Sequence, residues 1–182
     1  MILDIIVWFS RLRKTRFQWF SSWVTVHQHK PQGTGDALRQ CRQQLQSDHF
    51  LVLNGDDLFG AADLAGLAQC PAGVLVHPVD EPRRFGIAFL KPDGSLDKLV
   101  EKPDLPGPRL ANTGAYLFPR SVFDIEIALS PRGEYEITDY VTALAARQPF
   151  HVVGAEFWMP IGTEEAWNKA QQMPLASWIG LE

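Results

Sequence analysis

Polar residues with metal-binding chemistry follow an uninterrupted apolar run, Phe50 to Leu53, in the first third of the chain. Such a run, closed by turn residues, is typical of a strand buried on both faces. Ligands of open α/β sheets bind beyond the carboxyl ends of these strands. Gly55 allows the backbone to turn there, and the carboxylate of Asp56 suits a Mg²⁺ ion that carries a phosphate-bearing substrate. The alternative is that Asp56 and Asp57 cap the next helix or close a turn.

A glycine-rich loop, Gly33-Thr34-Gly35, is the second feature with binding chemistry. Glycines at the start of a helix let backbone groups approach a flat ring or an anion closely. Gln28, just before this loop, carries an amide that can pair with the edge of a nucleobase. The alternative is an ordinary turn between a strand and a helix.

Two further motifs could hold a phosphorylated sugar. Glu101 can accept hydrogen bonds from sugar hydroxyls, and Lys102 can neutralise a phosphate, although an exposed strand end would have the same composition. Asn112 lies within an apolar strand, where an amide needs a hydrogen-bonding partner. That partner is either a ligand hydroxyl or neighbouring backbone.

Alternating strands and helices must position these motifs. We expect strands at 2–9, 23–28, 50–54, 74–79, 85–90, 96–102, 110–118 and 150–157, and helices at 36–46, 61–69, 121–129 and 135–146, with a last helix capped by Thr163. Asp36 is the expected N-cap of the first of these helices. This order predicts an α/β sandwich with a mainly parallel sheet, to which the 85–102 hairpin adds an antiparallel piece.

Composition narrows the class of protein. The 182 residues are 46% hydrophobic and 21% charged with a net charge of −4, which predicts one soluble globular domain. The basic residues at 11–16 are expected on a solvated helix face, and no broad basic surface for nucleic acid is evident. The apolar run at 5–9 is too short to span a membrane. Two cysteines without metal or redox spacing favour a reducing, cytoplasmic setting.

Seven short motifs, in this order, resemble the sugar-1-phosphate nucleotidyltransferase family, the NDP-sugar pyrophosphorylases. They are Gln28 with Gly33-Thr34, Asn54-Gly55-Asp56, Arg84-Phe85-Gly86, Val100 to Pro103, Asn112-Thr113-Gly114, Glu134 to Asp139 and Trp158 to Thr163. The resemblance covers residues 24–170. It implies a three-layer α/β/α, Rossmann-like nucleotidyltransferase fold with a mainly parallel mixed sheet. We expect a single domain over 1–182, with an atypical start at 1–23.

The resemblance also implies a reaction and a set of site residues. The enzymes of this family are transferases that join a nucleoside triphosphate, here UTP or dTTP, to a sugar 1-phosphate in nucleotide-sugar biosynthesis, releasing pyrophosphate with the help of Mg²⁺. By resemblance, Gln28 and Gly33 hold the base, with Thr34 in the same substrate-binding loop. The other implied roles are catalysis and metal binding for Asp56, with Asp57 as a possible further ligand, and catalysis for Lys102, which would contact the sugar phosphate and face Asp56 across the site. Gly86, Glu101 and Asn112 would hold the sugar, Glu136 would support the sugar pocket, and Gly55 is a further substrate-binding residue.

Two departures from the family pattern bear on activity. The family begins with a strand and a loop containing Gly-Thr-Arg, whereas residues 2–9 look like its second strand, so we expect an N-terminally truncated version of the fold. Pro160 stands where the family pattern has an Asp that is the second metal ligand. These departures leave open whether the chain is an active enzyme. The alternative is a non-catalytic homologue or truncated product that binds a nucleotide sugar and regulates or pairs with an active subunit, such as a full-length homologue. A homo-oligomer is also open.

Overall fold

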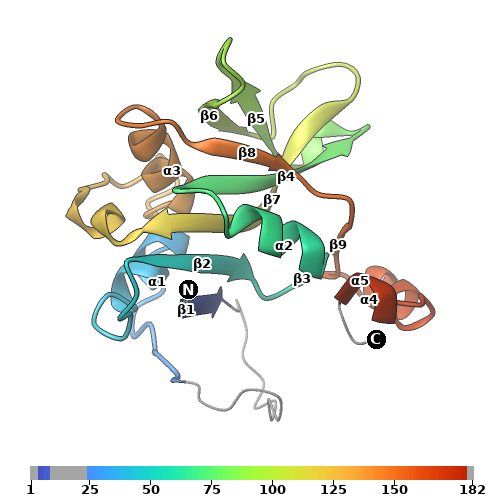
Figure 1. The fold of residues 1–182 in the computed structure, drawn as a ribbon, viewed down its shortest axis with the longest axis horizontal. Coiled ribbons are helices and arrows are strands. Elements are labelled where there is room, and N and C mark those ends of the chain that lie inside the picture. Colours follow the sequence, from blue (N-terminus) through green and yellow to red (C-terminus); the bar gives the residue numbers. More distant parts are fainter. Residues whose placement is uncertain (1–3, 9–23, 180–182) are drawn as a thin grey trace.

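A computed structural model describes residues 4–8 and 24–179. Its main sheet has the order β1-β2-β7-β4-β8 (Figure 1). These strands are β1 (Asp4–Trp8), β2 (His49–Asn54), β4 (Gly73–Val79), β7 (Arg109–Pro119) and β8 (His151–Gly154). β1 is parallel to β2 and β4 to β8, while β7 is antiparallel to both β2 and β4. Four of these strands therefore run in one direction and β7 runs against them, which confirms the mainly parallel mixed sheet.

Two smaller pieces of sheet flank the main one. The hairpin of β5 (Gly86–Leu90) and β6 (Leu96–Glu101) joins the sheet through an antiparallel pairing of β5 with β7, and it confirms the hairpin expected at 85–102. β3 (Asp57–Phe59) pairs separately with β9 (Trp158–Pro160). β3 follows directly after β2, so this pair begins at the end of a central strand.

Helices cover both faces of the sheet. They are α1 (Thr34–Gln40), α2 (Ala61–Leu67), α3 (Ile137–Ala145), α4 (Glu164–Gln171) and α5 (Ala176–Ile179), with 3₁₀ turns η1 (Pro82–Arg84) and η2 (Arg120–Asp124). Alternate side chains of β2 enter different cores, because strand residues point to opposite faces in turn. Phe50 and Val52 join the core of α1 and α3, whereas Leu51 joins that of α2. The three-layer α/β/α arrangement is confirmed.

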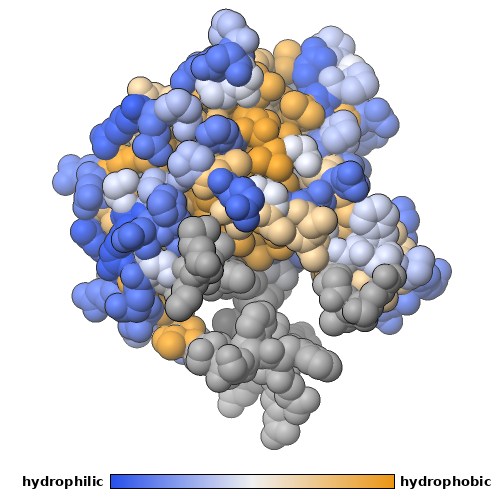
Figure 2. All heavy atoms as spheres, viewed as in Figure 1, coloured by the Kyte–Doolittle hydropathy of each residue, from blue (hydrophilic) through white to orange (hydrophobic). Residues whose placement is uncertain are grey.

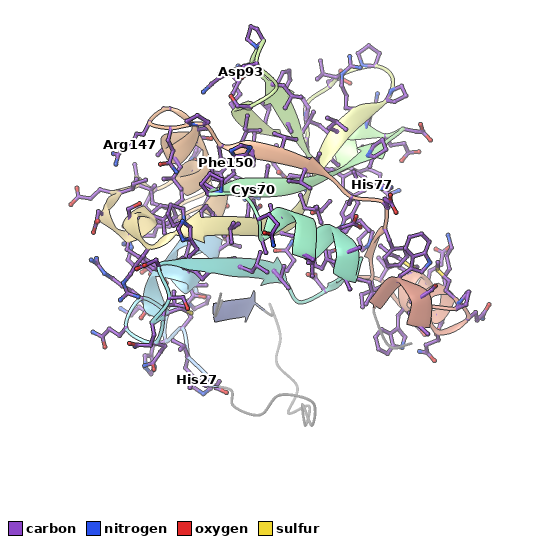
Figure 3. All side chains as sticks on the ribbon, viewed as in Figure 1. His27, Cys70, His77, Asp93, Arg147 and Phe150 are labelled. Atoms are coloured by element: carbon purple, nitrogen blue, oxygen red, sulfur yellow. The ribbon has the colours of Figure 1, made fainter. Side chains whose placement is uncertain are left out.

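Aromatic side chains fill the larger core. Phe50 stacks on Phe123 with ring centroids 5.5 Å apart, and Tyr116 stacks on Phe118 at the same distance. Phe150 is fully buried beside Phe118 at the end of the sheet where β8 begins (Figure 3). On the opposite, α2-covered face, apolar residues gather near the centre and polar residues surround them (Figure 2). None of the helices within 4–8 and 24–179 combines the length and apolarity needed to cross a membrane.

Several predicted elements were wrong. Of the strand expected at 23–28, the described residues 24–28 form none, and Val24 is 69% exposed, so this β-branched side chain has no sheet to pack on. The helix expected at 121–129 is only the short turn η2. The first helix begins at Thr34 after an N-cap Gly33, so Asp36 lies inside it and not at its cap. The basic cluster at 11–16 lies outside the described residues.

The remaining helices follow the sequence pattern more closely. Thr163 is the N-cap of α4, and its hydroxyl accepts a hydrogen bond from the Ala166 N–H at 3.2 Å, as predicted. α3 spans 137–145 within the expected 135–146, because Val141 and Leu144 supply one apolar face to the core.

Candidate functional site

The chemistry-bearing motifs converge on the carboxyl edge of the sheet. β2 ends at Asn54, and β7, which runs the other way, begins at the same edge, with Leu53 opposite Ala115. Asn112 of β7 pairs with Val76 near the end of β4, next to the position of His77 in Figure 3. The β5–β6 hairpin meets β7 at this edge, so the sequence motifs after β2, on β5, on β6 and on β7 share one region of the molecule.

The structure brings together in one corner of this region Gly86, Glu101 and Asn112, which the resemblance assigns to the sugar. Gly86 lies opposite Glu101 in the hairpin, and a Cβ on Gly86 would stand 3.1 Å from Glu101 Oε2 and 3.8 Å from Asn112 Nδ2. The absence of a side chain at Gly86 therefore leaves room for the carboxylate. A carboxylate and an amide side by side can accept from and donate to the hydroxyls of a sugar.

The two polar groups of Asn112 already have protein partners. Its Nδ2 donates to the hydroxyl of Tyr116 at 2.7 Å, and its Oδ1 accepts from the Gly114 N–H at 3.1 Å. The neighbouring-backbone alternative is thus confirmed, and a ligand would use the remaining donor and acceptor capacity of the amide. Burial raises the pKa of Tyr116, and the charges of Glu101 and Asp57 raise it further although the Asn112 hydrogen bond opposes them. Both carboxylates therefore lie near this buried phenol.

Asp56 and Asp57 occupy different environments. Asp56 is exposed in the turn after β2, and a Cβ on Gly162 would stand 3.5 Å from its Oδ2. Asp57 is half-buried at the start of β3 and accepts a hydrogen bond from Asn54 Nδ2 at 3.2 Å. Burial raises the pKa of Asp57 to about 7, while the Asn54 hydrogen bond opposes the shift. Neither residue caps α2, whose N-cap is Gly60, so the capping alternative was wrong and the turn alternative was right.

Trp158 links the acidic turn to the hairpin, a role that was not predicted beyond the place of this residue in the last motif. Its ring lies edge-on to Phe85 at 5.3 Å and to His77 at 6.0 Å between ring centroids. It pairs with Phe59 in the β3–β9 ladder, and its buried indole N–H has no hydrogen-bond partner among the described residues.

Lys102 is joined to Phe85 and Glu101. Its backbone N–H donates to the Phe85 carbonyl at 2.9 Å, and its Nζ lies 3.8 Å from Glu101 Oε1, with both side chains more than half exposed. Its φ of 45° is unusual for a residue with a side chain. Such left-handed residues persist where surrounding contacts hold them, and they cluster at binding sites. No measured contact joins Lys102 to Asp56, so that they face one another stays a prediction.

The glycine-rich loop is held from two directions. Gln28 Nε2 donates to the Gly33 carbonyl at 3.1 Å and to Oδ2 of the buried Asp36 at 2.6 Å. Both partners accept hydrogen bonds only, so the amide presents its Oε1 away from them. Gly33 has φ of 100°, and a Cβ there would overlap the carbonyl of Tyr135. The loop therefore packs directly on the segment that precedes α3.

That segment carries Glu136, whose side chain is only 15% exposed. Its Oε1 accepts from Ser130 Oγ at 3.1 Å and from Arg132 at 2.7 Å and 3.2 Å. These contacts with Glu136 raise the pKa of Arg132, and the charge of Glu101 contributes in the same direction. Arg132 therefore holds a cation against the carboxylate of Glu136. Sequence reasoning missed this residue, although an Arg-Gly pair directly before Glu134 was a signal that could have identified it.

The acidic turn of Asp56 and Asp57 supplies carboxylate oxygens, which are ligands that Mg²⁺ prefers. Among residues 4–8 and 24–179, no three His, Cys, Asp or Glu side chains gather as a metal site. Mg²⁺ takes oxygen ligands, keeps several waters and is often held by one or two carboxylates together with substrate phosphates. Asp56, exposed and next to Gly162, fits such a role, and Asp57 fits only when it is ionised. Pro160, which stands where the sequence resemblance leads us to expect a second carboxylate ligand, lies directly opposite Asp57 in the β3–β9 ladder.

Comparison with known proteins gives one consistent family. The sequence model described as "Nucleotidyl transferase" matches residues 9–176. The low-salt glycan biosynthesis nucleotidyltransferase Agl11 of Haloferax volcanii is 34% identical over 82% of this chain and 44% of its own. A glucose-1-phosphate thymidylyltransferase of Streptomyces griseus is 34% identical over 75% of this chain and 41% of its own. The chain thus spans less than half the length of these curated relatives.

A solved structure supports the same grouping. The putative glucose-1-phosphate thymidylyltransferase of Bacillus anthracis, crystallised in complex with a sucrose, is 30% identical with a TM-score of 0.65. The likeness covers 82% of this chain and 63% of that one. HddC of Yersinia pseudotuberculosis, at 21% identity and a TM-score of 0.59, shares the fold.

Proposed function

Because the chain belongs to the nucleotidyl transferase family, we propose that it joins a nucleoside triphosphate, UTP or dTTP, to a sugar 1-phosphate in the cytoplasm. The products are a nucleotide sugar and pyrophosphate. The observation that carries the proposal is the packing of Gly86, Glu101 and Asn112 into one corner of the carboxyl edge, with Lys102 beside them. Relatives named for the same chemistry support it.

The proposed reaction is a substitution at phosphorus. A phosphate oxygen of the sugar 1-phosphate attacks the α-phosphorus, the new P–O bond forms in line, and the bond to the β-phosphate oxygen breaks to release pyrophosphate. Two polyanions must meet, so positioning and charge neutralisation supply most of the rate enhancement. Lys102 and Arg132 would offset the phosphate charge. Glu101 and Asn112 would orient the sugar through its hydroxyls.

On the nucleotide side, Gln28 would accept a hydrogen bond from the base, because the hydrogen atoms of its amide are directed at Gly33 and Asp36. Asp56 would hold Mg²⁺, with Asp57 as a second ligand in its ionised form. When bound, this ion supplies positive charge next to the triphosphate. The side chain of Asp57 would otherwise remain on Asn54.

Isothermal titration tests the proposal. The chain is titrated with UTP, dTTP, glucose 1-phosphate and N-acetylglucosamine 1-phosphate, with and without Mg²⁺. We expect binding of one nucleotide and one sugar 1-phosphate, and weaker binding of the sugar 1-phosphate by Glu101→Gln. An exposed-site control, Asp97→Asn on β6, is expected to bind as the wild type does. Failure of every ligand to bind would overturn the proposal.

A second function is favoured by one observation, the placement of Pro160 opposite Asp57. A proline side chain cannot ligate a metal, so this chain would bind a nucleotide sugar without making it and would pair with an active homologue. Release of pyrophosphate separates the two functions. Turnover by the purified chain above the background of an Asp56→Asn variant excludes the binding-only function. Binding of UDP-glucose or dTDP-glucose without turnover excludes the enzymatic one.

A further inference from the structure

Thr34 belongs to the nucleotide loop by sequence, but its hydroxyl is engaged elsewhere. Thr34 Oγ1 accepts a hydrogen bond from the backbone N–H of Ile137 at 3.0 Å. Ile137 is the first residue of α3, and its N–H is one of the donors that a helix leaves unpaired at its start. The residue at the N-cap of α3, Glu136, makes no capping hydrogen bond with its own side chain. Thr34 therefore caps α3 from a position 103 residues away.

Two backbone hydrogen bonds fasten the same two segments. The Gly35 N–H donates to the Tyr135 carbonyl, and the Tyr135 N–H donates to the Gln32 carbonyl, both at 2.8 Å. The backbone of Glu136 lies 3.0 Å from where a Cβ on Gly35 would stand. Bonds between backbone atoms do not depend on side-chain identity, whereas the hydrogen bond of the Thr34 hydroxyl to Ile137 can be removed by a substitution.

The junction ends at the carboxylate of Glu136. This side chain leaves the backbone immediately before Ile137, and its Oε1 is already fixed by Ser130 and Arg132. A shift of the α3 N-terminus would move Glu136 and, through it, the Arg132 guanidinium. α3 packs against β6, the strand that ends at Glu101 in the sugar corner. Thr34 thus acts on the sugar side of the site from the loop on the nucleotide side.

We infer that Thr34 is a positioning residue of the sugar pocket and not a ligand of the base. By capping α3 at Ile137, it holds the neighbouring Glu136 in place. The inference rests on the proposed function, since it names what the junction between the two half-sites does. It assigns to Thr34 a different role from Gln28 and Gly33, its neighbours in the loop.

Separate affinities for the two substrates test this role. Thr34→Val removes the hydroxyl but keeps the shape, and Thr34→Ser restores it. We expect Thr34→Val to raise the Kd of the sugar 1-phosphate by about fivefold, the size expected for a lost helix cap, and to leave the Kd of UTP or dTTP unchanged within about twofold. Thr34→Ser is expected to recover wild-type affinity. Loss of nucleotide affinity with unchanged sugar affinity would make Thr34 a base ligand and overturn the inference.

Thr142→Val is the matched control on the same helix. Its hydroxyl donates to the Thr138 carbonyl on the exposed side of α3, so the variant makes the same chemical change without touching the loop. It is expected to bind both substrates as the wild type does.

A measurement without ligand keeps the inference separate from the proposed function. Hydrogen exchange of the Ile137 amide is expected to be about fivefold faster in Thr34→Val than in wild type, Thr34→Ser or Thr142→Val. Unchanged exchange would show that Thr34 does not cap α3 and would refute the inference. If exchange responds but no variant or wild-type protein binds a substrate, the capping stands and the proposed function fails.

Discussion

Asp57 offers the sharpest test of the acidic turn. Burial raises its pKa from 3.8 to about 7 in the folded protein, so the folded chain holds this proton more tightly than the unfolded chain does. The free energy of unfolding contributed by Asp57 therefore falls as the pH rises from 3.8 through 7. Between pH 5 and pH 8.5 the loss is about 2–3 kcal/mol, from two units of pKa at about 1.4 kcal/mol each.

Asp57→Asn removes this titration while keeping an oxygen that can accept from Asn54. Urea unfolding at pH 5 and pH 8.5, in the presence of a chelator, gives the free energy of unfolding of both proteins. Relative to the wild type, we expect the free energy of unfolding of the variant to be about 2–3 kcal/mol higher at pH 8.5 than at pH 5. Asp97→Asn, on the exposed face of β6, controls for the loss of one negative charge. If the difference between Asp57→Asn and wild type is the same at both pH values, Asp57 is not a buried titrating group.

The same experiment separates the two metal assignments. Adding Mg²⁺ at pH 8.5 stabilises any folded state that binds it. If Asp57 completes the metal shell with Asp56, the wild type gains more stability from Mg²⁺ than Asp57→Asn does. Equal gains would leave Asp56 and water as the protein-side ligands.

Three further substitutions probe the same edge of the sheet. Gly114→Ala places a Cβ on the Asn54 amide at a residue with φ of 82°, and we expect urea unfolding to show a loss of about 2–4 kcal/mol in the free energy of unfolding. Gly133→Ala is the control, because Gly133 has φ of 77° but open space around it, and we expect it to cost about 1 kcal/mol. Equal costs would contradict the overlap with Asn54. Gly86→Ala displaces the Glu101 carboxylate, so titration is expected to show about tenfold weaker binding of the sugar 1-phosphate with the fold retained. Gly66→Ala is the control, because a Cβ there has no neighbour within 4 Å. Unchanged affinity in Gly86→Ala would show that Glu101 does not bind the sugar. Pro160→Asp places a third carboxylate opposite Asp57, and calorimetry is expected to show about tenfold tighter Mg²⁺ binding; no change would remove this position from the metal site.

The strands at the centre of the sheet were predictable because their own residues decide them. Phe50 to Leu53 is apolar on both faces, and the structure buries those faces in two different cores. The hairpin around Pro92 to Ser95 was predictable for the same local reason, since turn residues separate two strand-like runs. The order of motifs was sufficient to identify the family, although each motif alone was weak.

The errors arose where distant residues decide the outcome. Residues 24–28 have strand-like side chains, but in the structure Gln28 turns its amide to Gly33 and Asp36 instead of ending a strand. Asp36, which was expected to cap its own helix, accepts a hydrogen bond from Gln28 instead. Thr34 caps a helix whose first residue lies 103 positions further along the chain. Trp158 became visible only when the fold brought it to Phe85. Propensity and spacing carry no information about such long-range partners.

Titration of the ¹⁵N-labelled chain with UDP-glucose or dTDP-glucose, followed by backbone amide chemical shifts, tests the central claim that the carboxyl edge of the sheet is the binding site. We predict that the largest shift changes fall on Gly33, on Gly55 and Asp56 after β2, on Gly86 and on Lys102. Changes confined to the opposite edge, at His49 and Gln69 to Pro71, or an unchanged spectrum at millimolar ligand, would contradict it.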